Sequence, residues 1–494
     1  MNPLLLTDGY KLDHRRQYPK GTTLVYSNWT PRKSRIEGIQ EVVFFGLQYF
    51  LKKYVIEDFN ACFFRQPKEK VIGQYARRIN NYLGDNQIGT QHIEALHDLG
   101  YIPMVFKALP EGSSVPVRVP MMTMYNTLPE FFWLTNYFET LISAVIWMPC
   151  TSATIARHYR TLLDNYAAQT SSVPEAVNFQ GHDFSMRGMP GIEAGMLSSA
   201  GHLLSFNGTD SVPAIDFLEQ YYRANSDKEL VGSSVPATEH SVMSMGTARN
   251  EKETFRRLIT EIYPAGIVSI VSDTWNLWNV ATEFLPALKE EILSRAGKVV
   301  IRPDSGDPAD ILCGRPEAKE ERERKGLIEI LWGVFGGKVN HKGYKELDAH
   351  IGAIYGDSIT IERAVQICER LKAKGFASTN VVLGIGSFTY QYNTRDTFGF
   401  AMKATYGEVN GEGREIYKDP VTDDGTKKSA KGLLKVVSEN GRYILYDQVS
   451  REEEKQGDLK EVFRDGNLLK DQSLAEIRTR IRQRSAVLTV QAER

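Results

Sequence analysis

The 494-residue sequence contains little cysteine and no long run of purely apolar residues. Its four cysteines lie far apart, without the paired spacing of a zinc site or a disulfide framework, so we expect neither and place the protein in the reducing cytoplasm. They are Cys62, Cys150, Cys313 and Cys368. The most apolar stretch, residues 131–150, includes Asn136, Glu139 and Pro149. A lipid-spanning helix needs about 20 predominantly apolar residues. We therefore predict a buried helix in this stretch.

The chain also lacks an excess of either charge, because it contains 60 basic and 61 acidic residues and its net charge is -1. Proteins that bind nucleic acid or anionic membranes usually carry a strong basic excess, so we expect neither kind of partner. The N-terminal residues include only three consecutive leucines before an acid, which predicts no secretory signal segment. The hydrophobic share of 42% and the charged share of 24% are typical of a soluble globular protein. The length predicts two or three domains.

Apolar runs of strand length alternate with amphipathic helical stretches in the middle of the chain. The runs are residues 266–271, 298–301, 351–355 and 380–383. This alternation is typical of βα units with parallel strands. We predict an α/β fold with a barrel-like parallel core over residues 156–400. Residues 1–155 and the C-terminal segment 401–494, which is rich in glycine and lysine, would together build a mixed α+β domain.

Small or charged polar residues follow each of these predicted strands. They are Ser272-Asp273, Arg302 to Asp307, Gly356-Asp357 and Gly384 to Ser387. The carboxyl ends of parallel strands form the active-site face of such folds, so these groups should share one rim. An arginine fork suits phosphate, an aspartate accepts hydrogen bonds from sugar hydroxyls, and glycine N–H groups can hold a phosphate. The rim therefore predicts a phosphosugar site, although each feature alone also fits a helix cap or a turn.

Two further segments carry candidate functional side chains. Residues 182–188 are predicted to form one short loop, which presents the aromatic ring of Phe184. Residues 236–241 precede a predicted helix and contain His240, which can act as a nucleophile, an acid or a phosphate ligand. The alternative interpretation makes His240 a hydrogen-bonded neighbour of a helix cap. His182 is the weaker candidate of the two histidines.

Ordered motifs along nearly the whole chain resemble the nicotinamide phosphoribosyltransferase family of type II phosphoribosyltransferases, in its bacterial or phage form. They include Thr7-Asp8-Gly9-Tyr10-Lys11, His182-Asp183-Phe184, Gly208-Thr209-Asp210, Glu239-His240-Ser241, Arg302-Pro303-Asp304-Ser305-Gly306, Gly356-Asp357, Thr394-Arg395-Asp396 and Lys418-Asp419-Pro420. The resemblance implies that nicotinamide and phosphoribosyl pyrophosphate react to nicotinamide mononucleotide and pyrophosphate, a step of NAD salvage. The rival interpretations are a nicotinate phosphoribosyltransferase and a non-catalytic signalling or binding protein.

The resemblance also implies roles for particular residues. Phe184 would stack on one face of the pyridine ring, and Tyr10 of the partner subunit would cover the other. Asp210 would accept a hydrogen bond from the carboxamide and repel nicotinate, and Arg302 would also border the nicotinamide. His240 and Asp304 would be the catalytic residues, the first phosphorylated by ATP and the second holding the ribose hydroxyls. The phosphate and ribose groups would be bound by Arg187, His240, Arg302, Asp304, Gly356, Asp357, Gly386, Ser387, Arg395, Lys403 and Lys418.

The same resemblance implies a homodimer with active sites shared between the subunits and ATP as co-substrate. Magnesium would be held mainly through the pyrophosphate, without a dedicated set of protein ligands. The chemistry agrees, because loss of pyrophosphate leaves positive charge on the ribose and negative charge on the leaving group. Such a site needs cations at the pyrophosphate and carboxylates near the ribose, which the rim supplies.

Overall fold

The computed structural model describes residues 1–356, 358–418 and 430–492, with side chains as far as residue 483. The chain divides into two compact units. The first comprises Met1–Thr154, Phe217–Ala224 and Asn393–Arg494, and the second comprises Ile155–Asp216 and Asn225–Tyr392. The chain therefore begins in the first unit, builds most of the second, and returns to the first.

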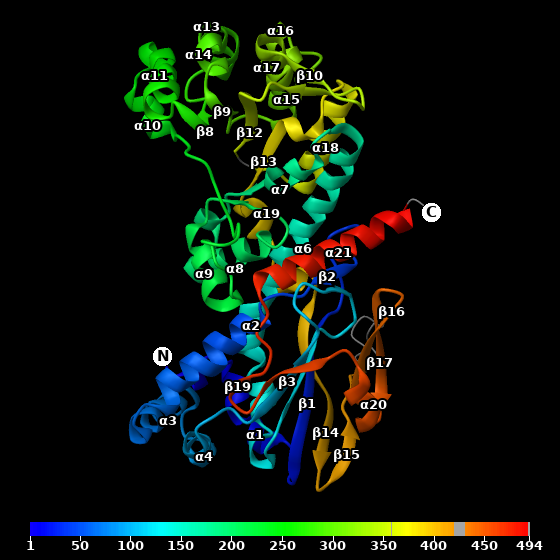
Figure 1. The fold of residues 1–494 in the computed structure, drawn as a ribbon. Coiled ribbons are helices and arrows are strands. Elements are labelled where there is room, and N and C mark those ends of the chain that lie inside the picture. The colour runs from blue at the N-terminus through cyan, green and yellow to red at the C-terminus, as the bar shows by residue number, and fades with distance from the viewer. Residues whose placement is uncertain (357, 419–429, 493–494) are drawn as a thin grey trace. The chain divides into compact units, whose positions relative to one another are not determined.

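A seven-stranded antiparallel sheet is the centre of the first unit (Figure 1). Its strands in spatial order are β15 (Glu412–Glu415), β14 (Phe400–Val409), β1 (Thr22–Pro31), β5 (Met122–Asn126), β3 (Met104–Ala108), β18 (Lys460–Arg464) and β19 (Asn467–Leu468). Strand β1 pairs with β14, so segments from opposite ends of the sequence are neighbours. This pairing confirms the predicted mixed domain of N- and C-terminal segments.

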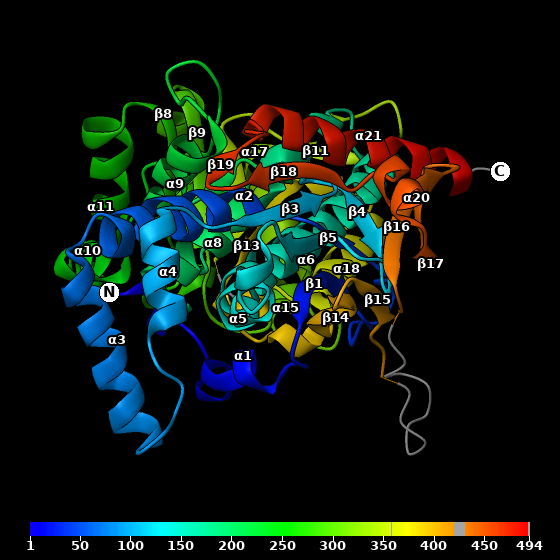
Figure 2. The same cartoon turned by 90° about the horizontal axis from the view of Figure 1, so that it is seen from below.

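Helices and two small ribbons complete the first unit. The helices include α3 (Lys68–Leu83), α4 (Gln91–Leu99), α20 (Arg451–Gln456) and α21 (Leu474–Ala492), and the ribbons pair β2 (Glu41–Val43) with β4 (Ser114–Pro116) and β16 (Leu433–Glu439) with β17 (Arg442–Val449). Helices α3 and α4 lie side by side (Figure 2).

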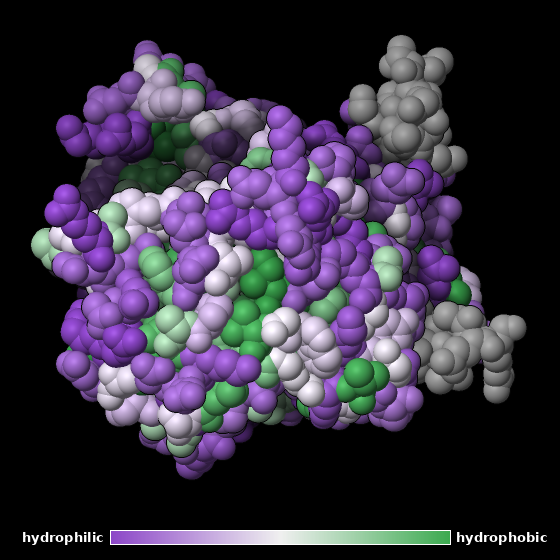
Figure 3. Space-filling model, turned by 90° about the horizontal axis from the view of Figure 1, so that it is seen from above, coloured by the Kyte–Doolittle hydropathy of each residue, from purple (hydrophilic) through white to green (hydrophobic). Residues whose placement is uncertain are grey.

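On the face drawn in Figure 3, hydrophilic residues predominate and apolar residues form small groups between them.

Helix α6 (Glu139–Thr170) contains residues 139–150 of the apolar stretch noted in the sequence, and the short helix α5 (Leu134–Tyr137) lies in its first part. By length and composition alone α6 could cross a membrane, yet 72% of its most apolar window is buried inside the structure. The core helix of a globular fold passes the same test. The helix contains Pro149. Its burial agrees with the buried helix that the sequence predicts in this stretch.

A curled sheet of six parallel strands forms the core of the second unit. In spatial order the strands are β7 (Gly208–Thr209), β6 (Gly181–Asp183), β13 (Val381–Ile385), β12 (Ile351–Tyr355), β9 (Ala296–Arg302) and β8 (Ala265–Val271). Each neighbouring pair is parallel. The four strands predicted from the apolar runs are adjacent in this sheet, and the α/β barrel-like core is confirmed.

Residues 233–238, here called the closing segment, join the two edges of this sheet. The N–H of Thr209 in β7 donates to the carbonyl of Ser233 at 3.0 Å. At the other edge, Ser269 of β8 donates to the carbonyl of Pro236 at 2.9 Å and accepts from the N–H of Thr238 at 2.9 Å. The closing segment thereby satisfies backbone groups that an open sheet edge would leave unpaired.

Helices of the second unit follow the strands and bury one apolar face each. They include α8 (Ile192–His202), α10 (His240–Met245), α11 (Glu251–Arg257), α15 (Pro308–Cys313), α17 (Leu327–Phe335), α18 (Ile361–Ala373) and α19 (Ser387–Tyr390). In α18 the buried side chains Ala364, Ile367, Cys368 and Leu371 recur at helical spacing. The Thr360 hydroxyl caps this helix by accepting from the N–H of Arg363.

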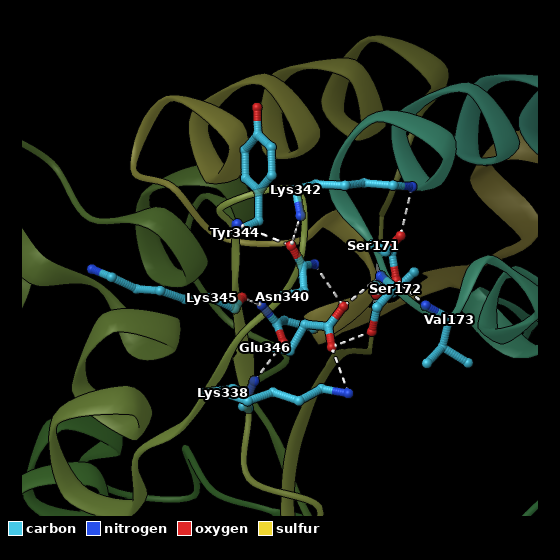
Figure 4. A network of polar contacts seen from close by, with 12 residues as sticks. Ser171, Ser172, Val173, Lys338, Asn340, Lys342, Tyr344, Lys345 and Glu346 are labelled. Carbon is cyan, nitrogen blue, oxygen red and sulfur yellow. Dashed lines mark hydrogen bonds and ion pairs between the residues drawn. The ribbon is translucent and has the colours of Figure 1, made fainter.

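A polar network lies at the end of the sheet opposite the predicted rim (Figure 4). It is centred on Glu346 in the hairpin of β10 (Gly337–Val339) and β11 (Lys345–Leu347). Glu346 accepts from the N–H and hydroxyl of Ser172 at 2.6 and 2.7 Å and from Asn340 Nδ2 at 2.8 Å. Lys338 Nζ lies 3.2 Å away. Burial opposes the ionisation of Glu346, but these donors outweigh it and lower its pKa to about 2.

Candidate active site

A cavity of about 430 Å³ lies inside the curled sheet of the second unit and is here called the lumen. Apolar side chains make up much of its lining: Phe179, Phe184, Val235, Ile267, Val300, Ile354 and Val382. The titratable side chains that line it are His182, Asp210, Lys298 and Arg302. Burial lowers the pKa of Lys298, with Asp348 opposing the shift. Such a space suits a flat, largely apolar ring with a few polar substituents.

A second cavity, of about 490 Å³, lies at the carboxyl ends of the strands and is here called the rim pocket. Its lining is mainly polar and includes Arg187, Thr238, Glu239, Asp304 and Gly356. Phe184, Asp210, Ala237 and Arg302 line both cavities, so the lumen and the rim pocket adjoin at these residues. A largely apolar cavity therefore meets a polar, charged one at these residues.

Strand β6 places two side chains of the lumen at alternate positions. His182 and Phe184 both line the lumen, whereas Asp183 between them does not. This alternation follows from the period of two along an extended chain. The prediction of one short loop over residues 182–188 was wrong at its start, because residues 181–183 pair with β13 and β7 and the N–H of Phe184 continues to the carbonyl of Ile385 at 2.9 Å.

The carboxylate of Asp210 lies at the junction of the two cavities. Its Oδ1 is 2.9 Å from His182 Nε2 and 2.7 Å from the Ser234 hydroxyl of the closing segment. Burial opposes its ionisation, but the hydrogen bonds from His182 and Ser234 and the nearby charge of Arg302 outweigh burial and lower its pKa. Asp210 is therefore an anion at neutral pH, with 45% of its side chain exposed.

Arg302 and Asp304 extend from the end of β9 into the rim pocket. Arg302 donates to the carbonyl of Thr238, and its Nε lies 3.7 Å from Asp304 Oδ1. Asp273 fixes the turn from the next strand, because its Oδ2 accepts from the N–H groups of Asp304 and Ser305 at 2.9 and 2.8 Å. A Cβ at Gly356 would lie 2.0 Å from Asp304 Oδ1, so a larger residue there would displace the Asp304 carboxylate.

His240 begins helix α10 directly after the closing segment. Its Nδ1 is 3.0 Å from the Thr274 hydroxyl, and its Nε2 is 3.8 Å from Asp304 Oδ2. About half of its side chain, 51%, is exposed. An accessible imidazole beside a carboxylate can act as a nucleophile toward a phosphoryl group.

The remaining predicted residues of the second unit lie near the same strand ends. Arg187 is exposed in the turn after β6 and lines the rim pocket. Gly386 and Ser387 follow β13, and a Cβ at Gly188 would lie 2.0 Å from the Ser387 hydroxyl. The turns after β6 and β13 are thus in close contact. Asp357 lies outside the described residues.

Four predicted residues belong to the first unit instead: Tyr10, Arg395, Lys403 and Lys418. The Tyr10 ring is 62% exposed. Arg395 Nη2 donates to the neighbouring Asp396 at 3.2 Å. Partial burial lowers the pKa of Lys403, and the nearby cations Lys11, Arg32 and Lys418 add to the effect against the attraction of Glu139. Mutually repelling cations of this kind favour a bound anion.

Sequence reasoning gave no role to several residues that the structure brings to the site. Asp273 was noted only as a polar residue after a strand, and His182 was ranked below His240. Ser234 belongs to a further motif of the family resemblance, Ser234-Val235-Pro236, but was given no role, and Thr274 was only the start of a predicted helix. One sequence clue could have identified Asp273. It follows a predicted strand, and the next predicted strand along the chain is the one that leads to Arg302 and Asp304.

Comparison with known proteins assigns the chain to a family. Residues 179–467 match the nicotinate phosphoribosyltransferase (NAPRTase) family, and residues 2–61 match the nicotinamide phosphoribosyltransferase N-terminal domain. The chain belongs to the nicotinate phosphoribosyltransferase (NAPRTase) family.

Within that family, similar curated relatives carry the name nicotinamide phosphoribosyltransferase. The protein of Acinetobacter baylyi is 55% identical over 98% of this chain and 97% of the relative. The protein of Mycoplasma pneumoniae is 36% identical over 87% of this chain and 94% of the relative. The family resemblance seen in the sequence motifs is thus confirmed.

Two solved structures share the fold. Nicotinate-nucleotide pyrophosphorylase from Pyrococcus furiosus matches with a TM-score of 0.55 and 14% identity, over 98% of this chain and 95% of that one. Human nicotinic acid phosphoribosyltransferase matches with a TM-score of 0.50 and 15% identity, over 97% of this chain and 93% of that one. At such low identity these matches concern the fold alone.

Proposed function

We propose that the chain transfers the phosphoribosyl group of phosphoribosyl pyrophosphate to nicotinamide, forming nicotinamide mononucleotide and pyrophosphate, as a cytoplasmic step of NAD salvage. The observation that carries this proposal is the junction of an apolar lumen and a charged rim pocket at Phe184, Asp210 and Arg302. The 55% identity to a relative named nicotinamide phosphoribosyltransferase supports it.

The lumen binds the pyridine ring in this proposal. Phe184 stacks on one face of the ring, and Tyr10 of the partner subunit covers the other. Asp210 accepts a hydrogen bond from the carboxamide N–H, and Arg302 borders the ring where the lumen meets the rim pocket. Apolar walls with one anion at the junction suit a neutral aromatic amide.

The rim pocket binds the phosphoribosyl group and the leaving pyrophosphate. Arg187 and Arg302 bind phosphate oxygens, because guanidinium groups match them in a bidentate manner. Asp304 holds the ribose hydroxyls and stabilises the positive charge that develops on the sugar as the bond to pyrophosphate breaks. Gly356, Asp357, Gly386 and Ser387 seat the phosphate and ribose.

The chain acts as a homodimer with shared active sites in this proposal. The cluster of Lys11, Arg32, Lys403 and Lys418 supports it, because the other three cations lie close enough to Lys403 to lower its pKa and such a cluster suits a bound anion. The partner's Lys403, Lys418 of the partner subunit and Arg395 then complete the pyrophosphate site. The exposed ring of Tyr10 also fits a residue that functions across an interface.

Magnesium enters together with pyrophosphate in this proposal. Such an ion binds through one or two carboxylates and the phosphate oxygens of its substrate. Among the described residues no group of three or more histidine, cysteine, aspartate or glutamate side chains is placed to hold a metal. Asp304 supplies an oxygen donor in a pocket that also carries phosphate-binding arginines, so the residues fit an ion brought in by its substrate. When bound, the ion neutralises charge on the leaving pyrophosphate.

ATP is the co-substrate, and His240 accepts its γ-phosphoryl group. The P–O bond to ADP breaks as a P–N bond to the imidazole forms, and the phosphohistidine is later hydrolysed. The half-exposed ring and its contact with Thr274 support this role, since Thr274 orients the imidazole. Phosphorylation beside Asp304 would then couple ATP hydrolysis to binding in the rim pocket.

Product analysis tests the proposed function. Purified protein is given magnesium, phosphoribosyl pyrophosphate and either nicotinamide or nicotinate, with and without ATP. We expect mononucleotide from nicotinamide and little from nicotinate. The ionised state of Asp210 favours this result, because a carboxylate beside a carboxylate ligand costs affinity. A preference for nicotinate would contradict the proposal while leaving the phosphosugar site intact.

A further inference from the structure

The two hydrogen-bond donors to Asp210 reach the same carboxylate oxygen. His182 Nε2 and the Ser234 hydroxyl are 2.9 and 2.7 Å from Oδ1. Within the part of the chain that the structure describes, no hydrogen bond reaches Oδ2 of this carboxylate. Oδ2 therefore remains to accept from a ligand. Because Asp210 is ionised, the neutral form of His182 has to carry its proton on Nε2 to make this contact.

The backbone fixes the His182 ring in this position. His182 is paired with Gly208 across β6 and β7, and a Cβ at residue 208 would lie only 2.6 Å from Nδ1. On its other side the ring contacts Phe184, with 4.6 Å between the ring centroids. The side chain of His182 is only 11% exposed. His182 thus contacts both the ring that would stack on the substrate and the carboxylate that would bind its amide.

Charge in the lumen gives this contact a further consequence. Asp210 is the only acidic side chain among the described residues that line the lumen, whereas Lys298 and Arg302 line it as cations. Asp183, the next residue in β6, and His202 are further titratable neighbours of His182, and burial lowers the pKa of His202 to about 4. Rejection of an anionic ligand therefore depends on the single negative charge of Asp210.

Resting on the proposed function, we propose that His182 is a positioning residue that orients Asp210 and thereby sets the preference for nicotinamide over nicotinate. Its contact with Oδ1 leaves Oδ2 to accept from a carboxamide N–H and to repel a carboxylate. Without this contact the Asp210 carboxylate is held less firmly against the two cations of the lumen, and the preference falls.

The ratio of kcat/KM for nicotinamide to kcat/KM for nicotinate tests this inference. The ratio cancels the steps common to both substrates, including those of His240 and the phosphosugar. His182→Phe should lower the ratio about tenfold, because Asp210 loses a hydrogen bond. His182→Gln, which keeps an N–H donor, should restore most of the ratio.

Two controls make the outcome decisive. His341→Gln removes an exposed histidine outside the lumen and should leave the ratio unchanged. Ser234→Ala removes the other donor to Asp210 and should also lower the ratio. Circular dichroism and thermal unfolding check that each variant is folded. If nicotinamide is used but folded His182→Phe keeps the ratio of the unaltered protein, this inference is wrong; if nicotinamide is not used at all, the proposed function is wrong.

Discussion

The carboxylates of Asp210 and Glu346 lie toward opposite ends of the same parallel sheet and are held in contrasting ways. Glu346 uses both oxygens within the protein, accepting from Ser172, Asn340 and Lys338. Asp210 receives its two hydrogen bonds on one oxygen only. The exposed fraction is 11% for the Glu346 side chain and 45% for Asp210.

This difference separates a carboxylate that stabilises the fold from one that is prepared for a ligand. The donors around Glu346 cap the end of α6 and fix a hairpin, so that its loss should be felt in stability. The donors around Asp210 orient it and keep it ionised but leave part of its capacity unused, so that its loss should be felt in substrate choice. The following substitutions test this division.

The largest effect is expected for Arg302→Ala, at the junction of the lumen and the rim pocket. Removing the guanidinium that is proposed to bind the phosphosugar should lower kcat/KM by about a thousandfold, as loss of a charge-stabilising donor does elsewhere. Steady-state kinetics would measure it. Arg315→Ala, which removes a half-exposed arginine paired with Glu317 and Glu323, is the matched control and should change kcat/KM less than twofold. Equal losses in the two variants would contradict the role of Arg302.

Asp210→Asn should come next, with a loss of about a hundredfold in the preference for nicotinamide over nicotinate. The substitution keeps the size of the side chain and removes the negative charge that repels the acid. Competition between the two substrates measures the preference. The same chemical change at the other end of the sheet, Glu346→Gln, should leave it unaltered. Unchanged discrimination in Asp210→Asn would mean that another group rejects nicotinate.

Glu346→Gln should lower the free energy of unfolding by about 2 kcal/mol, because buried donors lose a charged acceptor. The pKa of Glu346 is about 2 in the folded protein, below its ordinary value of 4.5. Ionisation of Glu346 therefore stabilises the fold fully above the ordinary value, and this stabilisation is lost as the pH falls toward 2. Urea unfolding at pH 7 and pH 3 should therefore show a smaller effect of the substitution at pH 3. An equal effect at both pH values would indicate that charge is not the cause.

The smallest effect is expected for Thr274→Val. Loss of the hydroxyl that lies 3.0 Å from His240 should slow phosphorylation by ATP a few-fold, about the effect of one neutral hydrogen bond. The phosphorylation rate is measured as the incorporation of acid-labile radioactive phosphate from ATP into the protein. His240→Asn should abolish this incorporation. Thr282→Val removes a hydroxyl that donates to the carbonyl of Trp278 one helical turn earlier, and provides the control. A normal rate in Thr274→Val would show that the imidazole is oriented by other contacts.

The sequence was sufficient to predict the long strands of the second unit and the polar residues that follow them. Runs such as residues 266–271 are long and apolar enough to give a clear signal, and the rule that active sites lie at the carboxyl ends of strands then places Arg302 and Asp304. Strands β6 and β7 were not predictable from periodicity, because three and two residues are too few.

The environment of Asp210 could not be predicted either. Its donors His182 and Ser234 are 28 and 24 residues away along the chain. They reach Asp210 only because β6 and the closing segment lie on either side of β7, the strand that Asp210 follows. The positions of the first-unit residues Tyr10 and Lys403 likewise depend on folding over long separations, since β1 and β14 are more than 350 residues apart in the sequence. Family resemblance, rather than local pattern, identified these residues.

The alternation along β6 bears on which inherited changes this site can tolerate. His182 and Phe184 share the lumen only because a single residue separates them, and their neighbours in β7 and β13 are set by the same register. A substitution at one position changes one contact, whereas the insertion or deletion of a single residue would exchange every inward side chain for an outward one. We therefore expect proteins that descend from this sequence to differ by substitutions at positions that line the lumen. We expect no insertions or deletions between Gly181 and Asp183.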